Sequence, residues 1–596
     1  MCGIVGYTGN NACTDILVEA LSKLEYRGYD SSGIATLGKN GIDICKEVGK
    51  LLNLKQKCDN GSLLDGSLGI GHTRWATHGK PTKENAHPHM GKRFVLVHNG
   101  IIENENYIKK TYLKNQTFKS DTDSEAIVLL LEYLVSSTKD TVLAIKHLIA
   151  ELKGSYALAI LDTQNPDVIY AVKNKSPLLI GVGDGFNMVG SDAMAMIEHT
   201  DTFFEIADKE YAEITKESIN IYTSYGKKIK KEPFKAHIDL GDIQKGTYSH
   251  YMLKEIEEQP SVIRRIIEKY SNKNGDIVIN KKIADDIRNC DRVYIVACGT
   301  SYHAGLLGKF YFENISAIPT DVYIASEFVY NMPLVSKKPF FVFITQSGET
   351  ADVRAAMVKV KEKGYRCLTV TNTPGSTLSR EAHHTMLIYA GAEIAVASTK
   401  AYTAQVATLA ILAAGVNNKI GINLHRELTL VANVMETLCL NKETYKNLAH
   451  EYLLDKRNCF YIGRSLDYYV CMEAALKLKE ISYIQTEGFA AGELKHGTIA
   501  LIEKDTPVIA INTWEDTNLN TRANIKEVKS RGAKVLCISR EGISSHSDKI
   551  IIDDVHEYLM PLVSIIPAHY LTYYAALEKG CDIDKPRNLA KSVTVE

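Results

Sequence analysis

The chain has 596 residues, which is too long for one hydrophobic core and predicts three or four domains. It has 70 Lys and Arg residues against 71 Asp and Glu residues. The resulting net charge of -1 gives no electrostatic reason to expect nucleic acid or an anionic membrane as a partner. The 12 cysteines include no C-x-x-C pair, so their spacing indicates neither a disulfide framework nor a zinc site.

No basic stretch followed by an apolar run marks a signal peptide at the start of the sequence, so we expect a cytoplasmic protein. The longest uncharged stretch covers residues 401–418 and contains Gln405 and two terminal asparagines. We interpret it as a buried helix of a large α/β core and not as a membrane span.

Residues 2–218 consist mainly of short apolar runs, with few long helical patterns between them. This mix predicts an α+β layered domain with a largely antiparallel sheet. Residues 226–235 are charged and poor in apolar side chains, as is typical of a linker, and residues 250–270 have the pattern of a helix. We therefore assign residues 219–282 to a linker and a bridging helix.

The first residues, Met1-Cys2-Gly3, raise the question of why a cysteine stands at position two. Removal of Met1 would leave Cys2 with a thiol and a free α-amino group. An α-amino group titrates near ~8, so it can accept the thiol proton, and nucleophile and base would belong to one residue. The sequence therefore allows an N-terminal nucleophile.

Residues further along the chain could complete such a site. An acyl transfer needs hydrogen-bond donors for the developing oxyanion, which the Asn99 side chain and the Gly100 backbone N–H could supply. Arg74 could bind the carboxylate of a free amino acid in a bidentate manner, and Asp123 could accept from its ammonium group.

The motifs MCGIVGY, LEYRGYDSSG, HTRWATHG, NAHPH and VHNGIIEN, in this order, closely resemble those of class II glutamine amidotransferases. In that family an N-terminal cysteine hydrolyses glutamine, and ammonia passes to a second site. The resemblance implies an N-terminal nucleophile fold of the layered αββα type. It also implies that Thr77 and His78 join Arg74 and Asp123 in binding glutamine, and that Trp75 gates an internal ammonia channel.

A group of histidines, His72, His78, His87, His89 and His98, raises the possibility of a metal site. The only tightly spaced pair is H-x-H at residues 87–89, and Pro88 lies inside it. We favour histidines that pack loops, and we expect no metal.

After residue 283 the pattern changes to buried strand, short loop and helix, repeated. It predicts two α/β domains with doubly wound parallel sheets, at residues 283–423 and 451–586, followed by a tail at residues 587–596. The two domains look like an internal repeat. The alignment places Val293 opposite Phe460 and Thr345 opposite Asn512.

The two copies differ in the loop after their second strand, which reads TQSGETAD in the first and NTWEDTNL in the second. Hydroxyls and backbone N–H groups at a helix N-terminus favour anions, and ligands of open parallel sheets bind at the carboxyl edge of the strands. No G-x-x-x-x-G-K-[ST] loop is present, which disfavours a nucleoside triphosphate.

CGTS, TQSGETAD and ASTKAYTAQ resemble the phosphosugar-binding motifs of the sugar isomerase (SIS) domain family. The resemblance implies that the phosphate and the sugar hydroxyls are bound without metal by Thr300, Ser301, Thr345, Gln346, Ser347, Thr350 and Ser398.

The segments EAALKLKEIS, EGFAAGELKHG and PRNLAKSVTVE extend the resemblance to enzymes that join both halves. Such enzymes transfer the amide nitrogen of L-glutamine to D-fructose 6-phosphate and isomerise the product to D-glucosamine 6-phosphate. The resemblance implies a homodimer without a cofactor. It implies that Lys591 forms a Schiff base, Glu480 moves the proton between C1 and C2, His496 opens the sugar ring from the partner subunit, and Lys477 supports the site by its charge. Thr498 replaces the proline that usual family members carry.

Other functions stay open at this stage. The enzyme could act on a different phosphosugar, or it could use free ammonia. A non-enzymatic alternative is a phosphosugar-sensing regulator, because fold alone does not decide function. No helix-turn-helix pattern supports the regulator, and Glu480 and Lys591 are both present.

Overall fold

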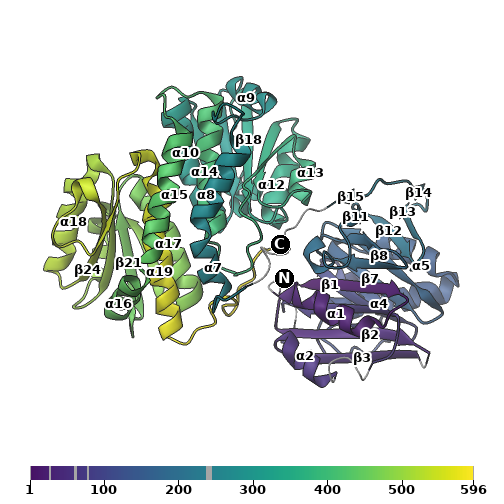
Figure 1. The fold of residues 1–596 in the computed structure, drawn as a ribbon. Coiled ribbons are helices and arrows are strands. Elements are labelled where there is room, and N and C mark those ends of the chain that lie inside the picture. The colour runs from purple at the N-terminus through teal and green to yellow at the C-terminus, as the bar shows by residue number, and fades with distance from the viewer. Residues whose placement is uncertain are drawn as a thin grey trace. The chain divides into compact units, whose positions relative to one another are not determined.

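The structure is a computed structural model that describes residues 2–25, 28–39, 41–58, 64–76, 79–235 and 245–594. The chain divides into two compact units, one of Met1–Leu240 with Ser592–Glu596 and one of Gly241–Lys591 (Figure 1). Within the described ranges, no helix combines the length and the apolar character that crossing a membrane requires.

The first unit contains two antiparallel sheets. One is eight-stranded, in the order β15-β11-β9-β10-β1-β4-β2-β3, and the other is seven-stranded, in the order β14-β13-β12-β8-β7-β6-β5. The strands of the first sheet are β1 (Gly3–Gly9), β2 (Ser31–Gly38), β3 (Gly41–Val48), β4 (Leu68–Arg74), β9 (Leu179–Val182), β10 (Phe186–Gly190), β11 (Thr202–Glu205) and β15 (Phe234–Lys235). Those of the second are β5 (His89–Met90), β6 (Phe94–Ile102), β7 (Gly154–Asp162), β8 (Asn165–Asn174), β12 (Glu210–Ile214), β13 (Ile219–Thr223) and β14 (Lys228–Ile229).

Helices cover the outer faces of these sheets. They are α1 (Cys13–Ser22) and α2 (Leu51–Lys57) on the first sheet, and α3 (Glu105–Tyr112), α4 (Asp123–Thr138) and α5 (Thr141–Glu151) on the second. Along β1 the side chains alternate, so Ile4 packs between the sheets while Val5 packs under α1. The layers are therefore helix, sheet, sheet and helix, which confirms the predicted αββα architecture.

The second unit contains two five-stranded parallel sheets with the same strand order. The first runs β17-β16-β18-β19-β20 and the second β22-β21-β23-β24-β25. In each sheet, the first strand along the chain lies between the second and the third, so the strand order reverses beside the first strand. Doubly wound folds bind ligands at the carboxyl ends of the strands where the order reverses. The strands are β16 (Arg292–Ala297), β17 (Thr320–Ile324), β18 (Pro339–Thr345), β19 (Arg366–Thr371), β20 (His384–Leu387), β21 (Asn458–Gly463), β22 (Gln485–Ala490), β23 (Pro507–Asn512), β24 (Lys534–Arg540) and β25 (Ile550–Ile552). The prediction of two doubly wound α/β domains is confirmed.

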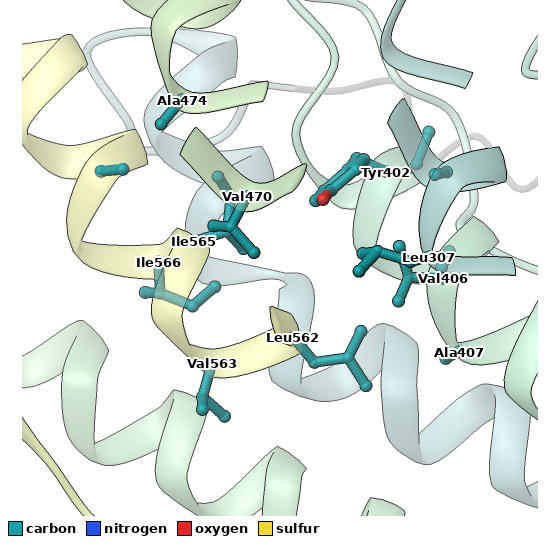
Figure 2. Close-up of a cluster of buried hydrophobic side chains, with 14 of the residues drawn as sticks. Leu307, Tyr402, Val406, Ala407, Val470, Ala474, Leu562, Val563, Ile565 and Ile566 are labelled. Carbon is teal, nitrogen blue, oxygen red and sulfur yellow. The ribbon is translucent and has the colours of Figure 1, made fainter. Parts of the chain in front are cut away.

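One hydrophobic core joins the inner faces of the two parallel sheets. Its helices include α7 (Tyr251–Glu257), α8 (Gln259–Tyr270), α9 (Lys281–Arg288), α10 (Gly299–Tyr311), α14 (Lys400–Val416), α15 (Leu424–Leu440), α16 (Lys442–Leu453), α17 (Leu466–Ser482) and α19 (Met560–Glu578). Figure 2 shows Leu307 of α10, Val406 of α14, Val470 of α17 and Leu562 of α19 in this core. Helix α14 is buried along nearly its whole length, as expected for residues 401–418.

The outer faces carry shorter helices. They are α11 (Ala325–Tyr330), α12 (Ala351–Glu362) and α13 (Thr377–Glu381) on the first sheet and α18 (Asn518–Ser530) on the second.

The sequence alignment of the two copies is wrong by one residue at their first strand. Val293 of β16 faces the shared core, whereas Phe460 of β21 faces the outer side, and it is Cys459 that faces the shared core. Side chains alternate along a strand, so a slip of one residue would turn every side chain to the opposite face. Val293 therefore corresponds to Cys459, and by the same shift Ser301 corresponds to Asp467.

The alignment of β18 with β23, which are the third strands of the two copies and were counted as the second from the sequence, agrees with the structure. Val342 of β18 and Ile509 of β23 both face the shared core. Each also pairs with the matching residue of its neighbouring first strand, Ile295 in one copy and Tyr461 in the other. Thr345 therefore does correspond to Asn512.

Candidate active sites

The Cys2 thiol lies against the backbone of Trp75. Its Sγ accepts from the Trp75 N–H at 3.3 Å and donates to the Trp75 carbonyl oxygen at 3.4 Å. The antiparallel pairing of β1 with β4, which sets Gly3 opposite Thr73, brings the two segments together. Burial raises the pKa of the Cys2 thiol, while the Trp75 N–H and the Arg74 guanidinium act to lower it. Attack by this thiol therefore requires a base.

Asn99 and Gly100 lie on β6 beside this cysteine. Asn99 Nδ2 donates to the Cys2 carbonyl oxygen at 2.9 Å and to Ser191 Oγ at 2.8 Å. Gly100 has a φ of 144°, and a Cβ atom there would lie 1.9 Å from the Ser155 carbonyl oxygen, so only glycine fits. The structure thus places the candidate oxyanion amide next to the candidate nucleophile.

Arg74 and Asp123 are both buried, with 3% and 5% of their surface exposed. The Arg74 guanidinium donates to the carbonyl oxygens of Gly79 and Lys80 at 3.2 and 3.3 Å. Asp123 begins α4, and its Oδ2 accepts from the Ile102 N–H at 2.9 Å. The proposed glutamine ligands Thr77 and His78 lie outside the described residues. The Trp75 ring packs edge-on against Tyr29, with a centroid distance of 6.1 Å.

In the second unit, hydroxyls line the loop between β18 and α12. The Thr345 and Thr350 Oγ1 atoms lie 2.8 Å apart, and the Gly348 N–H donates to Thr345 Oγ1 at 3.2 Å. Gly348 has a φ of 70°, and a Cβ atom there would lie 1.9 Å from Ser376 Oγ. This sharp turn carries Gln346 and Ser347 and ends at Thr350, the N-cap of α12.

At the start of α10, Thr300 meets two charged residues of α17. Its Oγ1 donates to Glu473 Oε1 at 3.0 Å and accepts from Lys477 Nζ at 3.0 Å. Lys477 Nζ also lies 2.6 Å from Glu480 Oε2. Ser301, the next residue of α10, accepts from Gln405 Nε2 at 3.0 Å. Helix α17 of the second α/β copy thus contributes to the carboxyl edge of the first.

The charged pair on α17 is buried and stabilised by mutual attraction. The side chains of Glu473 and Lys477 are 0% and 1% exposed. Burial alone would lower the pKa of Lys477, but Glu480 and Glu473 outweigh it and raise that pKa. His303 Nδ1 lies 2.7 Å from Glu473 Oε2. Sequence reasoning missed Glu473 and His303, although Glu473 lies one helical turn before Lys477 and could have been found by that spacing.

Lys591 is also buried, with 2% of its side chain exposed. Its Nζ donates to Ser398 Oγ at 3.1 Å and forms an ion pair with Glu393. Glu393 further accepts from Ser398 Oγ at 2.8 Å and from the N–H groups of Thr399 and Ala401 at 2.9 and 3.0 Å. Burial alone would raise the pKa of Glu393, but Lys591 outweighs it and lowers that pKa to about 2. Glu393 was not identified from the sequence.

His496 does not join this group. It lies exposed at the end of the 3-10 helix Glu493–His496, on the outer side of the second sheet. Among the described residues, none of the hydrogen bonds of Lys591 or Lys477 involves His496. The next residues, Gly497 and Thr498, continue this loop, and Thr498 Oγ1 lies 3.4 Å from the Leu494 carbonyl oxygen.

Comparison with known proteins agrees with both halves of this arrangement. A glutamine amidotransferase domain model matches residues 72–198, and a SIS domain model matches residues 286–415 and 452–579. The isomerizing glutamine–fructose-6-phosphate aminotransferase of Geobacillus kaustophilus is 57% identical over 602 residues, covering 100% of both chains. That of Listeria monocytogenes is 56% identical over 606 residues, again covering 100% of both. The chain belongs to this family.

A solved structure gives the same result for the second unit of this aminotransferase-family chain. The C-terminal domain of glucosamine-fructose-6-phosphate aminotransferase from Francisella tularensis is 35% identical, with a TM-score of 0.54, and covers 58% of this chain and 100% of its own. The described residues contain no group of three or more His, Cys, Asp or Glu side chains that could hold a metal ion.

Proposed function

We propose that the chain transfers the amide nitrogen of L-glutamine to D-fructose 6-phosphate and isomerises the product, giving D-glucosamine 6-phosphate and L-glutamate. The observation that carries this proposal is the position of Lys591. A lysine near the end of the chain, which would ordinarily be solvated, is buried 3.1 Å from Ser398, a candidate phosphosugar residue. An amine held in this way suits Schiff-base chemistry with a ketose.

Glutamine is cleaved at Cys2. With Met1 removed, the α-amino group of Cys2 takes the thiol proton, and Sγ attacks the carboxamide carbon of glutamine. The Asn99 amide exchanges its hydrogen bond to the Cys2 carbonyl oxygen for one to the resulting oxyanion, to which the Gly100 N–H also donates. The proton passes to the leaving nitrogen, ammonia departs, and water hydrolyses the thioester to glutamate and free Cys2.

Four residues hold glutamine for this attack. Arg74 binds the α-carboxylate and Asp123 accepts from the α-ammonium group, with Thr77 and His78 completing the pocket. Trp75 gates the passage of ammonia to the sugar. Replacing Trp75 with alanine is expected to release ammonia to solvent, so that more glutamate than aminosugar forms. Unchanged stoichiometry would overturn the gate.

The sugar reacts at Lys591. The phosphate binds in the loop of Thr345 to Thr350, together with Thr300 and Ser301. Glu393 takes a proton from the ammonium group of Lys591, the resulting amine adds to the C2 carbonyl, and water leaves, giving a Schiff base. Ammonia then displaces the lysine, which leaves an imine at C2.

Glu480 completes the isomerisation. It removes a proton from C1 and returns one to C2, while the C1 hydroxyl gives its proton to the imine nitrogen, so that the C2 imine becomes an amine and C1 becomes an aldehyde. Lys477 forms an ion pair with Glu480, with its Nζ 2.6 Å from Oε2 of the carboxylate. His496 protonates the ring oxygen as the sugar opens.

We further propose a homodimer in which His496 acts in the site of the partner subunit. Its exposure and its separation from the residues around Lys591 support this assignment. Light scattering is expected to give twice the mass of one chain. A fully active monomer would contradict the proposal.

To test the whole function, the purified protein is mixed with glutamine and fructose 6-phosphate, and the glutamate and glucosamine 6-phosphate that form are quantified. Equal amounts of both products are expected, and Cys2→Ala is expected to abolish both. Glutamate without aminosugar would point to another acceptor sugar. Neither product, in protein whose mass shows that Met1 is absent, would overturn the enzyme and favour a phosphosugar sensor.

A further inference from the structure

Four histidines of the glutamine amidotransferase domain are buried behind its candidate catalytic residues. His72, His87, His89 and His98 are between 0% and 4% exposed. The rings of His72 and His87 stack with a centroid distance of 4.0 Å, and the His89 ring meets His87 edge-on at 4.7 Å. Burying polar rings costs free energy unless their nitrogens find partners, so their hydrogen bonds indicate what they do.

The proton on His72 can be assigned from its partners. His72 Nε2 lies 3.0 Å from the His98 carbonyl oxygen, which can only accept, so this nitrogen carries the proton. The same Nε2 lies 2.9 Å from Asn99 Oδ1. Burial lowers the pKa of His72 to about 3, so the ring is neutral at physiological pH and keeps this single proton.

The orientation of the Asn99 amide follows by the same reasoning. One end of the amide faces the Cys2 carbonyl oxygen, which can only accept, so that end is the nitrogen. The other end, facing His72, is then the oxygen. Ser191 Oγ holds the nitrogen from a second side at 2.8 Å. Asn99 is therefore clamped between His72 on its oxygen and Ser191 on its nitrogen.

His98 and His87 connect these residues to the start of helix α4. The His98 N–H donates to His87 Nδ1 at 3.3 Å, so His87 carries its proton on Nε2, which lies 3.3 Å from Ser124 Oγ. Ser124 follows Asp123 at the start of α4. The His72–His87 stack thus links the Asn99 amide to the segment that presents Asp123.

We propose that His72 is a positioning residue for glutamine cleavage, and that it holds the Asn99 amide with its nitrogen toward Cys2. This inference rests on the proposed function of Cys2 as the nucleophile. An Asn99 amide that is free to rotate by half a turn would present its oxygen to the oxyanion, and repulsion would replace stabilisation. Removing one preorganised oxyanion donor typically lowers kcat by about 10²–10³-fold.

His72→Phe tests the clamp, because phenylalanine keeps a ring against His87 but cannot donate to Asn99. We expect kcat for glutamine hydrolysis to fall about 10²-fold, with KM for glutamine within about threefold of wild type. His72→Gln restores an N–H donor and is expected to recover much of the rate. In the double variant His72→Phe/Asn99→Ala, the rate should be no lower than in Asn99→Ala alone, because both changes remove the same donor.

Two measurements separate this mechanism from simple misfolding. Alkylation of Cys2 by iodoacetamide needs no oxyanion donor and should proceed in His72→Phe at the wild-type rate. If His72→Phe does not fold, Ser191→Ala tests the clamp from the nitrogen side, with an expected loss in kcat of about 3- to 10-fold.

The outcomes are distinguishable. Wild-type kcat in a folded His72→Phe or in Ser191→Ala would overturn the inference, as would losses that multiply in the double variant. A wild-type protein that releases no glutamate would instead overturn the proposed function.

Discussion

The two SIS copies share their strand order but differ in what occupies the loop after β18 and after β23. In the first copy this loop presents hydroxyls, and Ser301 faces Gln405 from the start of α10. In the second copy the position of Ser301 is taken by Asp467. Its carboxylate accepts from the N–H groups of Thr513 and Trp514 at 2.7 and 3.2 Å, and from Thr513 Oγ1 at 2.5 Å.

The backbone N–H groups of Thr513 and Trp514 correspond to those of Gln346 and Ser347. In the second copy, a carboxylate of the chain itself already occupies these donors, which an anionic ligand would otherwise need. Helix α17 of the second copy instead contacts the candidate site of the first copy, because its Glu473 and Lys477 both form hydrogen bonds with Thr300. The two copies thus share one fold, while the residues proposed for the sugar reaction lie at the sheet edge of the first copy.

The variant expected to lose most activity, and so to test this difference between the copies most strongly, is Lys591→Ala. Lys591→Ala should lower glucosamine 6-phosphate formation about 10³-fold or more, because the covalent nucleophile is removed. Glutamine hydrolysis should persist, since it is carried out by the first unit. Borohydride reduction in the presence of fructose 6-phosphate, followed by mass spectrometry, should find the sugar on Lys591 in the wild type. A sugar adduct on any other lysine would contradict this assignment.

A smaller effect is expected from a matched pair of threonines. Thr350 caps α12 in the first copy and Thr517 caps α18 in the second. Thr350→Val should raise KM for fructose 6-phosphate about 10-fold, since a hydrogen bond to a charged group contributes about 1.5–3 kcal/mol. Thr517→Val should leave KM unchanged. Equal shifts in the two variants would mean that both copies bind the substrate.

The parts of this structure that follow from local patterns were predictable from the sequence. The layered first domain and the two parallel sheets rest on apolar runs whose length and spacing indicate strands and helices. The pairing of Lys477 with Glu480 was also predictable, because both lie on one face of α17. The register of the repeat was not predictable from the sequence. Strands buried on both faces are apolar throughout, so β16 and β21 carry no alternation to align.

Contacts between residues far apart in the sequence could not be predicted from the sequence. The whole second SIS copy lies between Glu393 and Lys591 in the sequence, and no spacing rule links the two residues. The partners of His72 depend on which ring nitrogen carries the proton, and only the geometry of Asn99 and His98 decides this. Thr77 and His78 were predicted as glutamine ligands by resemblance alone and remain a prediction.

The smallest expected effect concerns the pH dependence of stability in the second copy. Burial raises the pKa of Asp467 to about 6, although Thr513 and Trp514 act to lower it. An unfolded aspartate titrates near ~3.9, so folding favours the protonated form. The contribution of Asp467 to the free energy of unfolding is therefore present at low pH and is lost as the pH rises from about 4 to about 6.

Asp467→Asn removes this titration while keeping the size of the side chain. From pH 4.5 to pH 7 the wild type should lose about 2 kcal/mol of stability that the variant does not lose, measured by urea unfolding at both pH values. Asp548 is a matched control in the same copy, because its ion pair with Arg522 lowers its pKa and reverses the sign. The variant Asp548→Asn should not change the pH dependence between pH 4.5 and 7, because the stability that the wild type gains from Asp548 arises below about pH 4, where an unfolded aspartate titrates. The same pH dependence in Asp467→Asn and in the wild type would contradict this prediction. It would mean that Asp467 stays ionised over this pH range because the N–H groups of Thr513 and Trp514 stabilise its carboxylate.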